Sequence, residues 1–145
     1  MTTAKKIMLI DDSPNDVELV TSALRDSHPA NEIIIAEDGK EALDYLYGRE
    51  IFANRPPGKP ALILLDIKMP MINGIEVLKV LRGDEAFNSV PVVMLTSSRD
   101  PMDIKECYDS GANSFVVKPI EFNSFKEAVK DLCKYWLVTN ELHEY

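Results

Sequence analysis

Three carboxylates end two apolar runs of this 145-residue chain. Asp11 and Asp12 follow a run that leads from Lys5 to Ile10, and Asp66 directly follows the apolar run Ala61 to Leu65. Apolar runs without alternating polar residues are typical of short strands buried on both faces of a parallel sheet. Ligands and chemistry in such sheets lie beyond the carboxyl ends of the strands. We therefore expect the three carboxylates to converge at one edge of a sheet.

A hydroxyl and an ammonium group end two further predicted strands. Thr96 follows Pro91 to Leu95, and Lys118 follows Ser114 to Val117. Two like charges 4 Å apart cost roughly 4 kcal/mol at an effective dielectric of 20, so Lys118 alone does not balance three carboxylates. Mg²⁺ best supplies the missing charge, because it accepts one or two carboxylates and keeps positions open for water and phosphate oxygens. Such a site is equipped to move a phosphoryl group onto a carboxylate.

Five predicted strands alternate with five predicted helices. Ser13 and Pro14 begin the first helix, which ends before His28, and the β-branched run Glu32 to Ala36 is the second strand. The third helix is centred on Ile75, Leu78 and Leu81, and the second begins at Asp38–Gly39. This alternation predicts the α/β class, as a flavodoxin-like (βα)5 doubly wound parallel five-stranded sheet in the order 2-1-3-4-5.

The last two helices carry the remaining apolar faces. The helix that begins at Asp100–Pro101 is expected to stop at Gly111 and to turn three side chains inward, those of Ile104, Cys107 and Tyr108. The final helix has an apolar face at helical spacing, made of Phe122, Phe125, Val129, Leu132, Cys133 and Trp136. We interpret this face chiefly as core, with a part of it left for a second copy or a partner.

Composition bounds the class of protein. A net charge of −8 argues against nucleic acid as a partner. No apolar run approaches the ~20 residues that span a bilayer, and Lys5–Lys6 leads into a strand rather than a signal peptide. We expect a cytoplasmic protein with a single domain over residues 1–145, a core of about 6–137 and a tail of 138–145. Cys107 and Cys133 are expected to be buried, reduced thiols.

The motifs together resemble those of response-regulator receiver domains in two-component signalling. The resemblance covers Lys6 to about Leu137 and rests on Asp11–Asp12, Asp66, Met69 to Gly74, Thr96 and Lys118–Pro119. It implies that Asp66 is the phosphoacceptor for the phosphohistidine of a histidine kinase, with Thr96 and Lys118 contacting the phosphoryl group. It also implies a Mg²⁺ site made of Asp11, Asp12, Asp66 and the backbone carbonyl of Lys68.

Further roles follow from the same resemblance. Phe115 stands at the position of the switch aromatic, which turns inward as Thr96 moves toward the phosphoryl group. The Lys118–Pro119 bond is expected to be cis, and Lys68 and Ser98 are expected to overhang the phosphoryl group and tune its lifetime. Such a chain is no enzyme in the ordinary sense, because it catalyses only its own phosphorylation and dephosphorylation.

Two features beyond the motifs resemble a particular group of receivers. Residues 48–60 contain Gly48, Pro56, Pro57, Gly58 and Pro60, which predict a long surface loop, and whether it binds a partner stays open. The final helix also extends through Tyr135 to Leu137. Both features look like the small stand-alone response regulators paired with cyanobacterial and bacterial phytochromes.

That likeness implies the partners. We expect a histidine kinase of the phytochrome type and a downstream protein target, with no nucleic acid and no membrane. A homodimer would form through the face made by the helix from Asp100, the strand Ser114 to Val117 and the last helix.

Three other functions use similar residues. A phosphorelay intermediate would pass the phosphoryl group onward and uses the same residues. An aspartyl-nucleophile phosphatase resembling the haloacid dehalogenase group wants Asp-x-Asp in the first strand, where this chain has Asp11–Asp12. A flavodoxin-like nucleotide binder needs a loop of backbone amides after the first strand, where Ser13–Pro14 supplies no glycine.

Overall fold

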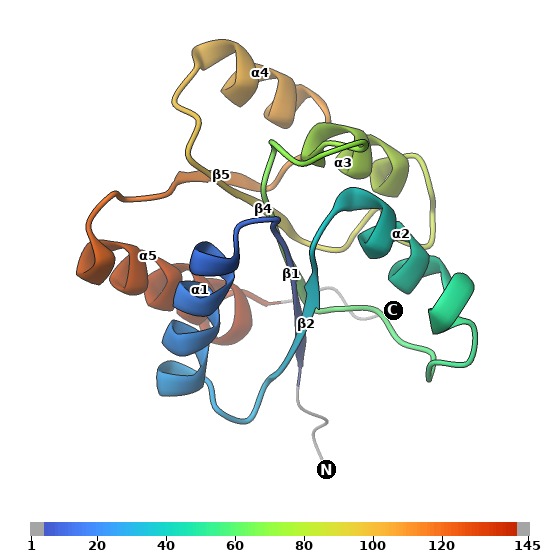
Figure 1. Ribbon diagram of the computed structural model, residues 1–145, viewed down its shortest axis with the longest axis horizontal. Coiled ribbons are helices and arrows are strands. Elements are labelled where there is room, and N and C mark those ends of the chain that lie inside the picture. The colour runs from blue at the N-terminus through green and yellow to red at the C-terminus, as the bar shows by residue number, and fades with distance from the viewer. Residues whose placement is uncertain (1–4, 142–145) are drawn as a thin grey trace.

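Five parallel strands form a single sheet in a computed structural model, which describes residues 5–141 (Figure 1). The order β2-β1-β3-β4-β5 confirms the predicted one. The strands are β1 (Lys6–Ile10), β2 (Glu32–Ala36), β3 (Leu62–Leu65), β4 (Val92–Thr96) and β5 (Ser114–Val117). Every residue of β3 and β4 is buried, as expected for central strands covered on both faces.

Five helices alternate with the strands, and four of them begin at a residue whose side chain caps the first turn. They are α1 (Pro14–Ser27), α2 (Gly39–Tyr47), α3 (Gly74–Arg82), α4 (Pro101–Asp109) and α5 (Phe122–Lys134). The side chains of Ser13, Asp38, Asn73 and Asp100 each accept a backbone N–H in the first turn of the helix that follows. The helix ends are therefore fixed locally, which sets where each strand-to-helix loop crosses the edge of the sheet.

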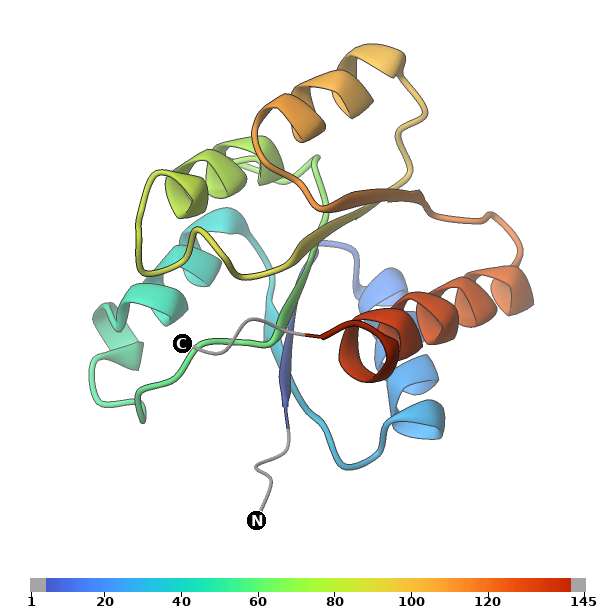
Figure 2. The same ribbon diagram turned by 180° about the vertical axis from the view of Figure 1, so that it is seen from behind.

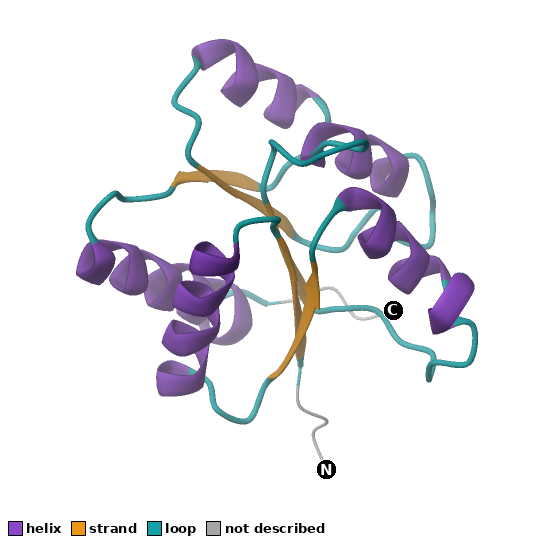
Figure 3. Ribbon diagram, viewed as in Figure 1, coloured by secondary structure: helices purple, strands orange, loops and turns teal. Residues whose placement is uncertain are grey.

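Two layers of helices cover the sheet (Figures 1, 2 and 3). α1 and α5 lie on one face, and α2, α3 and α4 lie on the other. Alternate residues of β1 serve the two layers: Ile7 and Leu9 pack toward α1 and α5, whereas Met8 and Ile10 pack toward the other helices. With both faces covered, only the ends of the strands are left for chemistry.

α4 departs from the sequence prediction at Tyr108. Cys107 of α4 is fully buried, but Tyr108 is 49% exposed, so the expectation that it faces inward is wrong. Successive helical residues are about 100° apart, and α4 covers the edge of the sheet with a narrow apolar stripe centred on Cys107. α5 continues through a π-helical turn, η2 (Tyr135–Thr139), which confirms the extended last helix.

The long loop lies between α2 and β3. It contains a single short 3-10 turn, η1 (Glu50–Phe52), and most of its residues are exposed, which confirms a surface loop. Arg55 anchors it, because its guanidinium donates to the carbonyls of Tyr45 and Leu46 at the end of α2.

The remaining expectations concern thiols and membranes. Both cysteines are free and buried, as predicted, and burial raises the pKa of Cys107 to about 11 and that of Cys133 to about 12. Over residues 5–141 none of the helices has the length and apolarity that a bilayer crossing requires. The end of the predicted tail, residues 142–145, lies outside the described residues.

Candidate functional site

The carboxyl ends of four strands bring the predicted site residues together. Asp11 follows β1, Asp66 follows β3, Thr96 ends β4 and Lys118 follows β5. Backbone hydrogen bonds carry the sheet past these positions: Asp66 N–H donates to the Ile10 carbonyl at 3.0 Å, and Lys118 N–H donates to the Thr96 carbonyl at 2.7 Å. All four side chains belong to buried residues, so the polar centre of the molecule is built on rigid strand ends.

Lys118 is the centre of the polar network. Its Nζ lies 2.8 Å from Asp11 Oδ2, 2.8 Å from Asp16 Oδ2 and 3.2 Å from Asp66 Oδ2. Burial by itself would lower the pKa of Lys118, but the hydrogen bonds to Asp11 and Asp16 and the charge of Asp66 outweigh it and raise the pKa. The group is therefore a permanent ammonium among carboxylates.

Each buried carboxylate is held by both of its oxygens. Asp11 accepts the Ser13 N–H at 2.9 Å on Oδ1, and Asp66 accepts the Ile67 N–H at 2.8 Å on Oδ1, which leaves Oδ2 of each for Lys118. Burial raises the pKa of Asp11, although the hydrogen bonds from Lys118 and Ser13 oppose that rise. Asp66 is thus oriented before any phosphoryl group arrives.

Three carboxylates fit a divalent cation. Ligand oxygens of Asp11, Asp12 and Asp66 all lie within 4.8 Å of one another, and Asp12 is exposed to water. Hard oxygen donors on one side and open solvent on the other are what Mg²⁺, Mn²⁺ or a similar ion requires. Because Lys118 is a single positive charge, such an ion would also relieve the repulsion among these groups.

A close backbone approach shapes the loop after β3. A Cβ at Gly74 would lie 2.0 Å from the carbonyl oxygen of Asp66, so a larger residue cannot be placed there without moving Asp66. The Gly74 N–H donates to the Ile67 carbonyl at 2.8 Å. Gly74 therefore closes the loop Ile67 to Asn73 tightly against the acidic centre.

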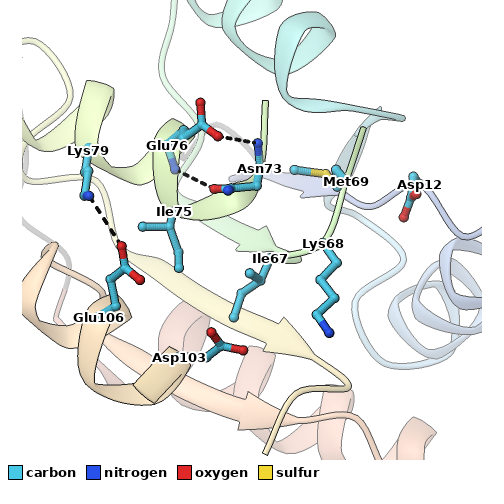
Figure 4. A pocket seen from close by; sticks show the side chains of 10 residues that line it. All are labelled: Asp12, Ile67, Lys68, Met69, Asn73, Ile75, Glu76, Lys79, Asp103 and Glu106. Carbon is cyan, nitrogen blue, oxygen red and sulfur yellow. Dashed lines mark hydrogen bonds and ion pairs between the residues drawn. The ribbon is translucent and has the colours of Figure 1, made fainter. Parts of the chain in front are cut away.

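That loop forms one wall of a groove of about 550 Å³ that runs between α3 and α4 (Figure 4). Lys68 is exposed and points into the groove, across from Asp103 of α4. Lys79 and Glu106 form an ion pair of 3.5 Å at the end away from Asp12 (Figure 4). The predicted lifetime-tuning residue Lys68 therefore stands at the solvent entrance of the site.

The residues after β4 join the site to α4. The Ser98 N–H lies 3.4 Å from Thr96 Oγ1, and the Ser98 hydroxyl donates to Asp103 Oδ2 at 2.6 Å. Phe115 of β5 is half-buried and packs against the core on the α2, α3 and α4 side. Hydrogen bonds thus connect Thr96 to α4 through Ser98, and Phe115 lies on the strand next to Thr96.

One prediction at this site is wrong. The described residues contain no cis peptide bond, so the Lys118–Pro119 bond is trans. The cis prediction rested on resemblance alone, and an X–Pro bond favours trans by about 0.5–1 kcal/mol unless its surroundings decide otherwise.

Asp16 belongs to the site, although its sequence position alone does not show this. Asp16 stands three positions after the cap Ser13, whose hydroxyl oxygen accepts the Asp16 N–H at 3.3 Å. The structure adds a second contact, from the Asp16 carboxylate to Lys118. The available signal was position: a carboxylate in the first turn of a helix that starts at the catalytic edge lies within reach of that edge.

The comparison with known proteins agrees with this geometry. Residues 7–130 match the response regulator receiver domain family, and the chain belongs to that family. It is 33% identical over 135 residues to response regulator Rcp1 of Synechocystis sp., covering 93% of this chain and 90% of that protein. The structure superposes on the phosphorylated cyanobacterial phytochrome response regulator RcpA with a TM-score of 0.92 and 34% identity, covering 97% of this chain and 99% of that one. The bacteriophytochrome response regulator RtBRR is 46% identical, with a TM-score of 0.77 over 97% of this chain and 84% of that one.

Membership of this family establishes the broad function. The chain is a receiver domain of phosphorylation-based two-component signalling, homologous to phytochrome response regulators, and the family pairs with histidine kinases.

Proposed function

We propose that Asp66 accepts the phosphoryl group from the phosphohistidine of a histidine kinase in a Mg²⁺-dependent reaction. The observation that carries this proposal is the network around Lys118 Nζ, which contacts Asp11 at 2.8 Å and Asp66 at 3.2 Å inside a buried edge of the sheet. Asp11, Asp12, Asp66 and the backbone carbonyl of Lys68 would hold the ion. Its charge would offset negative charge on the transferring group.

The residues of the chain divide the remaining work. An oxygen of Asp66 forms the new P–O bond as the P–N bond to the kinase imidazole breaks, and the imidazole leaves with the electron pair of that bond. Lys118 and the Thr96 hydroxyl donate hydrogen bonds to phosphoryl oxygens, where negative charge gathers. In this proposal the chain catalyses only its own phosphorylation and dephosphorylation.

The output is a change in protein contacts. Thr96 moves toward the phosphoryl group, Phe115 follows inward, and the face of α4, β5 and α5 changes its preference among partners. Exposed apolar side chains of α4 and α5, namely Met102, Tyr108 and Phe122, support a docking or homodimer surface. Sedimentation with and without a phosphoryl mimic tests the dimer, and the mass of a monomer in both states would exclude it.

The biological setting follows from the relatives. We infer a stand-alone response regulator in the cytoplasm that acts downstream of a phytochrome-type kinase and upstream of a protein target. Support comes from two phytochrome-associated relatives that match 97% of this chain. Phosphotransfer from a purified phytochrome-type kinase, compared with one unrelated kinase, tests the pairing; equal rates from both would count against it.

Lys68 and Ser98 set the lifetime of the phosphoryl group. Lys68 stands at the entrance of the groove, and Ser98 is fixed by its 2.6 Å bond to Asp103. We expect Lys68→Ala and Ser98→Ala to change the half-life of the phosphorylated protein about threefold or more, because each alters how water reaches the phosphorus atom. Half-lives equal to wild type in both variants would refute this role.

Intact-mass spectrometry tests the phosphoacceptor. The wild-type chain and Asp131→Asn, which alters an exposed aspartate of α5, should both gain one phosphoryl group with acetyl phosphate and Mg²⁺. Asp66→Asn and an EDTA-treated sample should gain none. A phosphoryl group on Asp66→Asn would contradict the assignment.

A further inference from the structure

Asp16 contacts the ammonium group of Lys118 without belonging to the acidic triad. Its Oδ2 lies 2.8 Å from Lys118 Nζ, as short as the contact from Asp11. The carboxylates that lie within 4.8 Å of one another are those of Asp11, Asp12 and Asp66, and Asp16 is not among them. Its side chain is 25% exposed, on the first turn of α1. Asp16 therefore touches Lys118 from outside the group that fits a cation.

The ammonium group of Lys118 is fully used. An ammonium has three N–H donors, and here they meet three carboxylates, those of Asp11, Asp16 and Asp66. The contact with Asp66 is the longest, at 3.2 Å. Three acceptors in three directions fix the rotation of the ammonium and the path of the long lysine side chain.

Phosphorylation changes one of these three partners. Once Asp66 carries a phosphoryl group, its carboxylate becomes an acyl phosphate and the negative charge moves onto the phosphoryl oxygens. The N–H that faced Asp66 then has a stronger acceptor in the phosphoryl group. Asp11 also lies close to Asp12 and Asp66 as a member of the acidic triad, whereas Asp16 contacts only Lys118 in this network. Asp16 is thus the partner whose charge and bonding stay constant through the reaction.

We propose that Asp16 is a positioning residue that holds Lys118 so that one N–H remains aimed at the phosphoryl position. This inference rests on the proposed role of Asp66 and adds a residue to it. The role requires an acceptor oxygen on residue 16 more than a charge, because orientation is what the contact supplies. A neutral amide at this position should therefore preserve most of the effect.

The test measures the rate of phosphorylation by acetyl phosphate in Mg²⁺, followed by intact mass. We expect Asp16→Ala to slow the maximal rate about tenfold, since misplacement of a catalytic group by a fraction of an ångström has effects of this order. Asp16→Asn should stay within about threefold of wild type, because its amide oxygen still accepts from Lys118.

A matched variant separates this role from loss of an ion pair on α1. Asp26 is also an aspartate of α1 that pairs with a lysine of another element, Lys126 of α5, at 3.1 Å. Asp26→Ala should phosphorylate at the wild-type rate. Calorimetric Mg²⁺ affinity should stay within about threefold of wild type in Asp16→Ala, because Asp16 lies outside the triad.

A double-mutant cycle decides between positioning and general damage. In a Lys118→Met background, adding Asp16→Ala should slow the residual rate no further, because the group that Asp16 positions is gone. An equal slowing in both backgrounds, or a wild-type rate for Asp16→Ala, would overturn the proposal. Asp66 would still stand as the phosphoacceptor in that case, provided that the wild-type protein gains a phosphoryl group. A wild-type protein that gains no phosphoryl group would instead overturn the proposed function.

Discussion

Two cations stand at opposite ends of β5 and are satisfied in different ways. Lys118 follows the strand and donates to three carboxylates. Arg82 reaches the residues before the strand from the end of α3, and its guanidinium donates to the carbonyls of Gly111, Phe87 and Val90 and to the side chain of Asn113. Lys118 faces carboxylates, one of which phosphorylation would change. Arg82 faces mostly backbone carbonyls, which phosphorylation does not alter.

The difference separates catalysis from architecture in one sheet. Gly111 has a φ of +103°, and a Cβ there would lie 2.7 Å from Arg82 Cγ. The backbone at Gly111 therefore packs directly against the arginine side chain. A planar guanidinium suits several fixed acceptors, whereas a compact ammonium on a flexible stem suits acceptors that move or change charge. Arg82 therefore joins α3 to β4 and β5, and Lys118 joins the reacting groups.

The largest expected effects come from removing each cation. Lys118→Met should destabilise the protein by about 3 kcal/mol in EDTA, because it leaves buried carboxylates without their cation. Saturating Mg²⁺ should recover a large part of that loss, since the ion supplies the missing charge. Arg82→Ala should cost about 2–4 kcal/mol with or without Mg²⁺, because it strands backbone carbonyls that no ion can satisfy.

Urea unfolding of both variants in EDTA and in Mg²⁺ measures these losses. Arg82→Ala should also keep the wild-type rate of phosphorylation under conditions where it is folded, whereas Lys118→Met should not. A loss of stability that depends on Mg²⁺ in Arg82→Ala, or one that does not depend on Mg²⁺ in Lys118→Met, would contradict this difference between the two cations.

A smaller effect is expected from Asp12, the exposed carboxylate of the acidic triad. In EDTA, Asp12→Asn should stabilise the protein by about 1 kcal/mol, because one repulsive partner of Asp11 and Asp66 is removed near solvent. The same variant should lose most of the stabilisation that Mg²⁺ gives wild type. Thermal unfolding with and without Mg²⁺ checks both signs, and a variant less stable than wild type in EDTA would contradict the repulsion.

The smallest expected effect is a change in the pKa of Asp84, which lies two residues after Arg82. The Tyr47 hydroxyl donates to Asp84 Oδ2 at 2.7 Å and holds the pKa of Asp84 below its ordinary 3.8. This carboxylate therefore adds stability above its unfolded pKa and loses that contribution as the pH falls through the lowered folded-state pKa. Tyr47→Phe should move the NMR titration midpoint of Asp84 upward toward its ordinary value. An unmoved midpoint would mean that the hydroxyl does not hold the carboxylate.

Much of the fold and of the site could be predicted from sequence because the signals are local. Buried apolar runs that end in Asp11, Asp66, Thr96 and Lys118 mark strand ends, and the parallel topology alone then brings those ends together. Cap residues such as Ser13 likewise fixed where helices start. These features need no knowledge of how far one side chain reaches toward another.

The features that the sequence did not predict depend on how far side chains extend and on how the helices pack. The Asp16 contact with Lys118 joins residues 102 positions apart, and nothing local distinguishes it from an ordinary first-turn acid. Tyr108 fits an apolar helical face, but α4 sits at the sheet edge, where only Cys107 is covered. The isomer of the Lys118–Pro119 bond depends on the folded surroundings of the proline, which the amino-acid sequence does not reveal.

Chemical trapping tests the central claim most directly. Borohydride reduces an acyl phosphate of aspartate to the alcohol homoserine, and peptide mass spectrometry then locates the converted residue. After acetyl phosphate and Mg²⁺, the account predicts conversion at Asp66, and no conversion of Asp11, Asp12 or Asp16 under the same conditions. Conversion at any of those three carboxylates, with Asp66 unmodified, would contradict the assignment of Asp66 as the group that Lys118 serves.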